Sequence, residues 1–219
     1  MRTLFLFLTA IIAYVLGSIN GAIIAGRFVF HKDVRRYGSG NAGLTNYYRI
    51  FGTPGIILLV LIDVLKTVVA TLIGGALMSK YDAREVGILF AGFCVILGHM
   101  FPAYYQFRGG KGVLCGVTMA FMADWRVGLC CLLTFLILLL FTRYVSLGSI
   151  VGAALCPAYL WVFGHEKLCI FLGALCALLI VIKHAENIVR LISGRESRID
   201  LGGPRRKKED DDFVDPRKN

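Results

Sequence analysis

The sequence predicts an all-α integral membrane protein with about seven transmembrane helices. Hydrophobic side chains make up 57% of the 219 residues, and charged side chains make up only 17%. The mean hydropathy is +0.71. A soluble domain carries about 25% charged residues and uses them to cover its surface. The composition therefore excludes an ordinary soluble enzyme, and its high hydrophobicity excludes a disordered chain.

Seven apolar runs define the expected helices: Thr3–Gly26, Gly52–Ser79, Val86–Phe107, Gly112–Ala123, Val127–Thr142, Tyr144–Gly164 and Leu168–Ile182. A spanning helix needs about 20 residues, so the fourth run, with 12 residues, is expected to form a short helix. Up to residue 194, ten Lys and Arg residues fall in the connections on one side and five on the other. The positive-inside rule therefore predicts an outside N-terminus and a cytoplasmic C-terminus.

The chain is expected to consist of a membrane-embedded domain, residues 1–195, and a charged, disordered cytoplasmic tail, residues 196–219. The net charge of +10 indicates positive-inside topology, an anionic ligand, or both. The seven cysteines show no zinc-ligand spacing, and no run of carboxylates suggests a divalent metal. No metal, other cofactor or nucleic-acid partner is expected.

The first polar cluster is the segment Gly38-Ser39-Gly40-Asn41-Ala42-Gly43, followed by Thr45, Asn46 and Arg49. It matches the G-x-G-x-x-G pattern of dinucleotide-binding proteins, but no buried strand precedes it, so that interpretation is rejected. Glycines let the backbone approach an anion, and the next helix offers unpaired N–H groups. A glycine-rich turn with Thr and Asn helix caps explains the same residues equally well.

The second cluster runs from Gly98-His99-Met100-Phe101-Pro102 to Arg108-Gly109-Gly110-Lys111-Gly112. It lacks the Ser or Thr of a Walker A loop, yet it places two cations and flexible backbone before the short helix, which suits a phosphate. The alternatives are a topology-determining charge for Lys111 and a core histidine for His99.

The third cluster contains His184, Glu186, Asn187 and Arg190. On a helix, His184 and Asn187 share a face, and Glu186 and Arg190 can form an i, i+4 ion pair. Within the second apolar run, Asp63 and Lys66 are i, i+3. A charged residue within a membrane span is by default a candidate for a functional role. An ion pair that neutralises itself and has a structural role explains Asp63 and Lys66 equally well. We expect all three clusters to lie on the same, inner side of the membrane.

Seven motifs occur in order: Gly17-Ser18-Ile19, GSGNAGLTN at 38–46, D-x-x-K at 63–66, GHMFP at 98–102, GGKG at 109–112, TRYVSL at 142–147 and H-x-E-N-I at 184–188. Together they resemble the PlsY-type acyl-phosphate:glycerol-3-phosphate acyltransferases of bacterial membranes. The resemblance implies a seven-helix enzyme of the inner (plasma) membrane with its active site facing the cytoplasm. It also implies acyl transfer from acyl phosphate to the 1-hydroxyl of sn-glycerol 3-phosphate, giving lysophosphatidate and phosphate in the first step of phospholipid synthesis.

The resemblance also implies roles for individual residues. The catalytic positions are Ser39, Arg49, His184 and Asn187, and Glu186 is structural. With the glycine-rich clusters, the expected substrate-binding set is Gly38, Gly40, Asn41, Gly43, Thr45, Asn46, His99, Arg108, Gly109, Gly110, Lys111, Gly112 and Ser149. The sequence departs from the family at Asn20-Gly21-Ala22, where Pro-Phe-Gly is usual, and at Ala185, where Arg is usual.

Acyl phosphate already carries a good leaving group, so a covalent enzyme intermediate gains little. We therefore expect direct attack in a ternary complex, with backbone N–H groups of Gly38–Gly43 and the Asn187 side chain stabilising the oxyanion. The base is either His184 or a substrate phosphate oxygen. Two alternatives remain: Ser39 as an acylated nucleophile activated by His184, and a membrane carrier of phosphorylated anions that uses the same cations.

Overall fold

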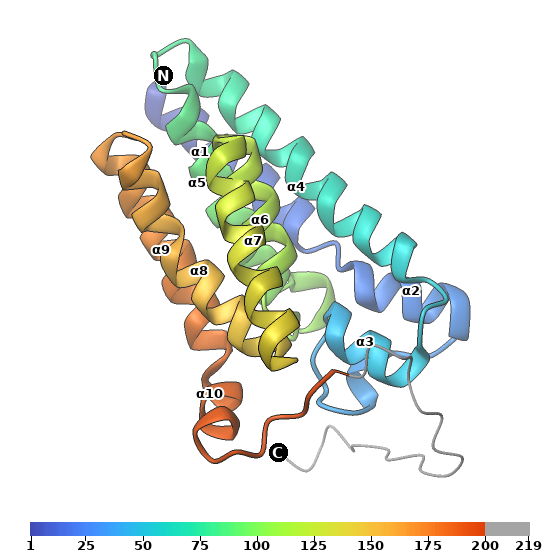
Figure 1. Ribbon diagram of the computed structural model, residues 1–219. Helices are drawn as coiled ribbons and strands as arrows, with labels where there is room; N and C mark the ends of the chain where they lie inside the picture. Colours follow the sequence, from blue (N-terminus) through green and yellow to red (C-terminus); the bar gives the residue numbers. More distant parts are fainter. Residues whose placement is uncertain (200–219) are drawn as a thin grey trace.

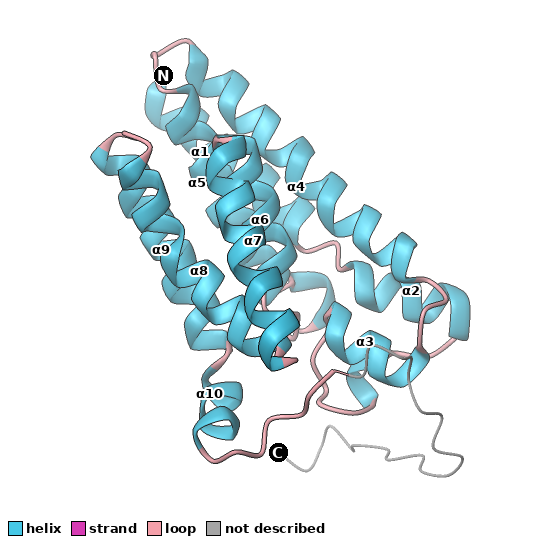
Figure 2. Cartoon of the chain, viewed as in Figure 1, coloured by secondary structure: helices cyan, strands magenta, loops and turns pink. Residues whose placement is uncertain are grey.

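The computed structural model describes residues 1–199, which contain helices and loops but no strand (Figures 1 and 2). Two 3-10 turns cover Val34–Arg36 and Ala103–Tyr105. The α-helices are α1 (Arg2–Gly17), α2 (Gly21–Phe30), α3 (Leu44–Phe51), α4 (Ile56–Ser79), α5 (Arg84–Met100), α6 (Val113–Ala123), α7 (Trp125–Thr142), α8 (Val145–Val162), α9 (Lys167–Lys183) and α10 (Ala185–Ile192). Most of the predicted tail, residues 200–219, lies outside the described residues.

The helices confirm the all-α, multi-pass class. Five helical stretches within the described residues are long and apolar enough to cross a membrane, and α9 with α10, bent by 61°, forms a sixth candidate. The α6 helix is short, as expected from the fourth apolar run, and its 11 residues rise about 16 Å. The count of seven spans and the orientation in the membrane stay predictions.

The bundle is polar inside and apolar outside. On α4, the outward side chains Ile57, Leu61 and Leu65 are at least half exposed, whereas Asp63 and Lys66 are buried. A soluble helix shows the opposite arrangement. An apolar outer face with small and polar residues inside is what a lipid environment favours.

Close helix packing depends on glycine at the contact between α4 and α5. A Cβ atom on Gly74 would lie 2.5 Å from the Gly87 carbonyl oxygen, and one on Gly87 would lie 2.3 Å from the Gly74 carbonyl oxygen. These backbones therefore touch, and any larger side chain at either position would push α4 and α5 apart.

The first apolar run forms one candidate span, Arg2–Phe30, in agreement with the span that the sequence predicts over Thr3–Gly26, but this span contains a break. The α1 helix ends at Gly17, and α2 begins at Gly21 after an extended Asn20. The Asn20 side chain accepts a hydrogen bond from the Ile23 N–H at 3.0 Å, which caps α2. Its amide also donates to the Ala42 carbonyl oxygen at 3.2 Å, so the break is tied to the glycine-rich segment.

The connections that carry the three polar clusters lie at one end of the bundle. The α1, α5, α7 and α9 helices run toward this end, and α4, α6 and α8 run away from it (Figure 1). Figure 2 shows long loops around α2, α3 and α10 at this end. The prediction that the clusters share one side is confirmed.

Candidate active site

A cavity of about 270 Å³ opens at the end of the bundle where the clusters meet. Its polar part is lined by Ser39, Asn41, Thr45, Asn46, Arg49, Lys111, Ser146, His184, Asn187, Arg190 and Glu196. Its apolar part is lined by side chains of α6 to α9, including Val117, Met119, Cys131, Leu132, Phe135, Cys156 and Ile180. One cavity therefore offers cations and amides beside an apolar chamber.

Small residues on two helices let the walls of the apolar chamber pack closely. The α8 helix contributes Gly148, Gly152 and Cys156 at four-residue intervals, and α9 contributes Gly173 and Ala177. A Cβ atom on Gly148 would lie 2.8 Å from the Phe135 carbonyl oxygen on α7, and one on Gly173 would lie 2.5 Å from Leu160 Cδ1 on α8. These glycines therefore serve close contacts between α7, α8 and α9 around the chamber.

Lys111 joins the second and third clusters. It lies just before α6, and its ammonium group donates to Asn187 Oδ1 on α10. Burial, with a further contribution from nearby Arg190, lowers the pKa of Lys111 from 10.5 to about 8 against the opposing charge of Glu196. A half-buried ammonium group with other cations nearby is poised to gain from an added anion.

Arg49 brings the first cluster to the same place. It lies on α3, lines the cavity, and donates from Nη2 to the Ser197 carbonyl oxygen at 3.4 Å. Arg190 on α10 adds a third cation to the cavity wall. These cations come from three separate parts of the sequence, so only the fold assembles the group.

Glu196 is a buried acidic side chain in the polar part of the cavity. Its Oε1 accepts from Ser146 Oγ and from Asn187 Nδ2, both at 2.7 Å. Its Oε2 accepts from Arg190 Nε at 2.7 Å. Burial alone would raise the pKa of Glu196, but these three hydrogen bonds hold it below the ordinary value. The side chain is therefore a carboxylate at neutral pH.

Asn46 holds the glycine-rich segment in shape. Its Oδ1 accepts from the Ser39 N–H at 3.0 Å, and its Nδ2 donates to the carbonyl oxygens of Val34, Tyr37 and Asn41 at 3.1–3.2 Å. Gly38 and Gly40 adopt φ values of +57° and +69°, which glycine reaches without strain. The backbone contacts of Asn46 indicate a positioning role for this residue.

The Gly109-Gly110 pair packs against His99. A Cβ on Gly109 would lie 2.0 Å from the His99 carbonyl oxygen, and one on Gly110 would lie 2.2 Å from His99 Nε2. The Gly110 N–H donates to the His99 carbonyl oxygen at 3.0 Å. Glycine is required here because no side chain fits, and the contact fixes the loop that carries Lys111.

Below this loop, Asp63, Lys66 and His99 form a buried charged group that closes the break between α1 and α2. Asp63 Oδ1 pairs with Lys66 Nζ at 2.7 Å and accepts from the Gly21 N–H at 3.2 Å. Lys66 Nζ donates to the carbonyl oxygens of Gly17 at 3.1 Å and Ile19 at 2.6 Å. The pair therefore satisfies backbone groups exposed by the break, which supports its structural interpretation.

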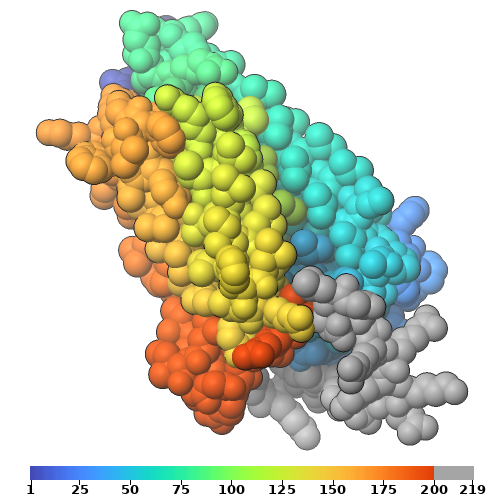
Figure 3. All heavy atoms as spheres, viewed as in Figure 1, coloured from blue at the N-terminus to red at the C-terminus, as the bar shows by residue number. Residues whose placement is uncertain are grey.

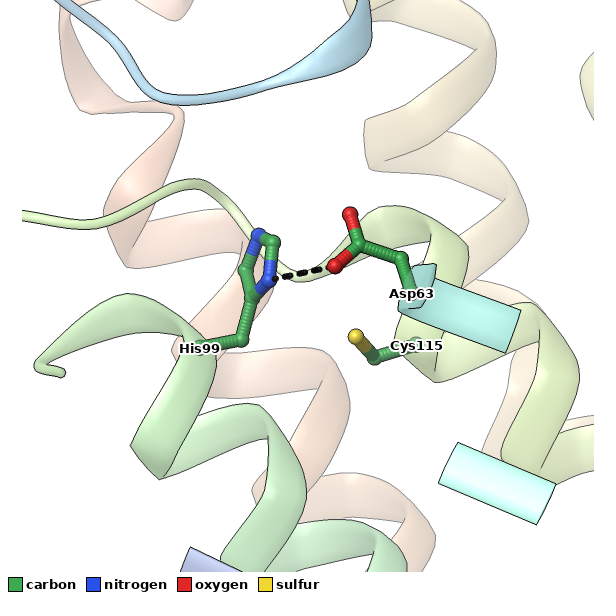
Figure 4. Close-up of side chains that lie close together, drawn as sticks. All are labelled: Asp63, His99 and Cys115. Carbon is green, nitrogen blue, oxygen red and sulfur yellow. Dashed lines mark ion pairs between the residues drawn. The ribbon is translucent and has the colours of Figure 1, made fainter. Parts of the chain in front are cut away.

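Figure 4 shows the Asp63 carboxylate directed toward the His99 ring, with the Cys115 thiol beside them. Their donor atoms lie within 4.8 Å of one another, a spacing that could suit a metal. However, Lys66 Nζ lies 2.7 Å from Asp63 Oδ1 and 3.0 Å from His99 Nδ1. An ammonium ion already occupies the position of a cation, so these residues do not fit a metal ion.

His184 lies where α9 meets α10, and it is buried and lines the cavity. Its Nδ1 lies 2.8 Å from the Ile180 carbonyl oxygen. Because a carbonyl oxygen only accepts, Nδ1 carries the proton and Nε2 of the neutral ring keeps a lone pair. A backbone group thus orients the ring in place of a carboxylate.

The cavity brings together most, but not all, of the predicted site residues. It is lined by Ser39, Asn41, Gly43, Thr45, Asn46, Arg49, His99, Lys111, Gly112, Ser149, His184 and Asn187. Gly38, Gly40, Arg108, Gly109 and Gly110 do not line it. Arg108 is exposed. The predicted Glu186–Arg190 pair is confirmed at 3.6 Å and lies on the surface.

The sequence did not predict two features of the site, the Glu196 side chain and the wall of the apolar chamber. Glu196 falls in the predicted tail, and nothing in the Arg-Glu-Ser-Arg composition signals a buried carboxylate. The wall of the apolar chamber did leave a signal, because small residues recur every four positions at Gly148, Gly152 and Cys156. That spacing predicts close helix packing or a groove and does not distinguish them.

Fold and site together define a multi-pass membrane protein whose cavity places cationic side chains beside an apolar chamber. The family model described as glycerol-3-phosphate acyltransferase matches residues 7–194. The chain belongs to this family, and it is accordingly a membrane acyltransferase for glycerol 3-phosphate in phospholipid biosynthesis. The resemblance to PlsY-type enzymes is confirmed.

Individual relatives agree. The glycerol-3-phosphate acyltransferase of Thermoanaerobacter sp. strain X514 is 38% identical over 192 residues, covering 88% of this chain and 94% of the relative. That of Shewanella loihica is 39% identical over 201 residues, covering 91% and 94%.

Two solved structures have the same fold. Both are crystal structures of PlsY (YgiH), an integral membrane glycerol 3-phosphate acyltransferase. Its glycerol 3-phosphate form is 34% identical with a TM-score of 0.81, covering 89% of this chain and 96% of that one. Its lysophosphatidic acid form is 33% identical with a TM-score of 0.78, covering 90% and 97%.

Proposed function

We propose that this protein transfers a fatty acyl group from acyl phosphate to the 1-hydroxyl of sn-glycerol 3-phosphate by direct attack in a ternary complex. The products are lysophosphatidate and inorganic phosphate. One observation carries the proposal: three clusters with cationic side chains, two of them glycine-rich, meet in a cavity whose other part is apolar. Such a cavity accommodates a phosphate and an acyl chain at the same time.

The phosphate of glycerol 3-phosphate is assigned to Lys111, Arg49 and the amide of Asn187. Lys111 has one protein acceptor among the described residues, Asn187 Oδ1, and an ammonium group has three protons to donate. Arg49 can bind a phosphate through two parallel N–H groups. The acyl chain of the donor is assigned to the apolar part of the cavity, which side chains of α6 to α9 line.

In the reaction, the 1-hydroxyl oxygen forms a bond to the acyl carbon, and the bond between that carbon and the phosphate oxygen breaks. The leaving phosphate takes the electron pair. The sequence-predicted oxyanion donors are the backbone N–H groups of Gly38–Gly43 and the Asn187 amide. The N–H groups of Ser39, Gly40 and Gly43 already donate to Asn46, Tyr37 and Asn41, so the proposed donors are narrowed to the Asn41 N–H and the Asn187 amide, both from residues that line the cavity. The hydroxyl proton passes to Nε2 of His184 or to a substrate phosphate oxygen, and the tautomer set by Ile180 supports His184.

Ser39 has no hydrogen bond to His184 in the described part of the chain, so no nucleophile–base pair is assembled there. This supports direct transfer over an acylated Ser39.

Initial-rate kinetics test the proposal with purified protein, acyl phosphate and labelled glycerol 3-phosphate. Direct transfer requires both substrates to be bound together, so double-reciprocal plots should intersect. Parallel lines, or an acylated Ser39 trapped without glycerol 3-phosphate, would contradict it. Product formation in detergent also excludes a pure carrier, and replacing acyl phosphate by acyl-CoA identifies the donor.

We also propose that the site faces the cytoplasm from the inner (plasma) membrane of a bacterium. The excess of Lys and Arg on the site's end of the bundle supports this orientation. A topology reporter at residue 83, between α4 and α5, should read the outside. A cytoplasmic reading there would overturn the orientation.

A further inference from the structure

The chain after α10 folds back over the polar end of the cavity. Gly194 has a φ of +68°, a left-handed conformation that turns the chain away from the helix. Residues 195–199, which we call the strap, then run past the end of α7 toward α3 (Figures 1 and 3). The Ile199 N–H donates to the Arg143 carbonyl oxygen at 2.9 Å, which attaches the far end of the strap to the connection between α7 and α8.

The strap is attached mainly through one buried side chain. Glu196 is 7% exposed, whereas Arg195, Ser197 and Arg198 are exposed and Ile199 is half-buried. Little apolar surface therefore holds the strap, and the Glu196 carboxylate is its principal contact with the cavity. A carboxylate held by hydrogen bonds can be exchanged for another anion without disrupting a hydrophobic core.

One of the groups that hold Glu196 also belongs to the proposed phosphate site. Ser146, Asn187 and Arg190 donate to its two oxygens at 2.7 Å, and Asn187 in turn accepts from Lys111. Arg190 lines the same cavity as Lys111 and Arg49. Carboxylates and phosphates take the same charge-assisted hydrogen bonds. The carboxylate therefore occupies the Asn187 amide N–H beside the cations of the site, and a phosphate cannot accept from that N–H until the carboxylate leaves.

We propose that Glu196 is an internal competitor for the phosphate of glycerol 3-phosphate, and that the strap moves aside when this substrate binds. The inference rests on the proposed phosphate site. If the carboxylate fills the site nine-tenths of the time, the apparent affinity for the substrate falls about tenfold. The family match ends at residue 194, so the strap tunes substrate affinity from outside the matched region.

Steady-state kinetics of Glu196→Ala and Glu196→Gln test the proposal. Both variants should lower the KM for glycerol 3-phosphate, Glu196→Ala by about tenfold, with kcat unchanged or raised and the KM for acyl phosphate changed less. Glu166→Gln is the matched control, because Glu166 is an exposed glutamate before α9 at the opposite end of the bundle. An unchanged or raised KM, or a fall in kcat, would overturn the proposal and make Glu196 a positioning residue for Asn187 and Arg190.

Titration calorimetry with glycerol 3-phosphate in the absence of donor separates this proposal from the one on which it rests. Tighter binding by both Glu196 variants and weaker binding by Lys111→Ala supports both proposals. Weaker binding by Lys111→Ala with no gain in the Glu196 variants overturns the internal competitor alone. If Lys111→Ala binds as the wild type does, the proposed phosphate site itself is wrong. Thermal unfolding of each variant checks its fold, and Glu196→Gln retains the test if Glu196→Ala does not fold.

Discussion

Lys66 is buried and Lys111 is half-buried, and both contact breaks in the helical bundle, but their surroundings differ. Lys66 lies on α4, and its ammonium group reaches the break between α1 and α2, where Asp63 and the carbonyl oxygens of Gly17 and Ile19 surround it. Lys111 lies opposite the bend between α9 and α10 and contacts Asn187. The first lysine has used all its donors within the protein, whereas the second keeps donors for a ligand.

This difference separates a structural charge from a binding charge. An ammonium group has three protons to donate. Lys66 donates to the Asp63 carboxylate and to the carbonyl oxygens of Gly17 and Ile19. Lys111 lines the cavity, and Lys66 does not. Both lysines belong to motifs that the sequence singles out, D-x-x-K at 63–66 and GGKG at 109–112, so motif membership alone does not reveal which one binds substrate. The number of hydrogen-bond acceptors that the protein itself offers to each ammonium group distinguishes the two lysines.

Removing Lys66 should have the largest effect, and it should be on stability. Lys66→Met leaves the buried Asp63 carboxylate without its cation and two carbonyl oxygens without a donor. Breaking a buried pair in this way costs about 3–5 kcal/mol. Thermal unfolding in detergent measures the loss, with Lys80→Met as control because Lys80 is exposed at the end of the same helix. Equal stability of both variants would show that Lys66 does not support the break.

Removing Lys111 should instead affect substrate binding. Lys111→Ala should raise the KM for glycerol 3-phosphate about 10- to 100-fold, since a charged hydrogen bond contributes about 1.5–3 kcal/mol. The KM for acyl phosphate should change much less, and thermal stability should stay close to that of the wild type. Small, equal effects on both substrates would mean that Lys111 is only a topology-determining charge.

The two lysines also mark the limits of the sequence prediction. Apolar runs located the helices, and charge bias placed three clusters on one side, because both depend on local composition. The break at Gly17–Gly21 was missed because Asp63 and Lys66, more than 40 positions away, stabilise it. Glu196 was missed because its burial depends on a turn after α10 that returns it to Asn187 and Arg190 and on the distant Ser146 of α8. Contacts between distant segments decide which polar residues bind ligand, and composition does not report them.

The pH dependence sharpens the comparison. The pKa of Lys111 is about 8 because burial penalises its charge, so the free enzyme loses this cation as the pH rises through 8. For glycerol 3-phosphate, kcat/KM should therefore fall above pH 8. The kcat should hold to higher pH, because bound phosphate favours the protonated lysine. Lys111→Arg keeps its charge and should lack this alkaline limb, and an identical limb in that variant would assign it to another group.

The smallest effect is expected for the surface pair on α10. Glu186 and Arg190 lie 3.6 Å apart, with the Glu186 side chain 87% exposed. Exposed i, i+4 pairs contribute about 0.3–0.5 kcal/mol. Glu186→Ala should therefore change the free energy of unfolding by no more than about 0.5 kcal/mol. A loss of several kcal/mol would show a structural role that its exposure does not indicate.

The most direct test of the central claim is calorimetric binding of glycerol 3-phosphate to the wild type, Lys111→Ala and Arg49→Ala, without acyl donor. If Lys111 and Arg49 form the open anion site, the wild type binds one substrate per chain and both variants bind at least tenfold more weakly while unfolding at the wild-type temperature. Wild-type affinity in both variants would contradict the claim, because the cations assembled at the cavity would then not hold the substrate.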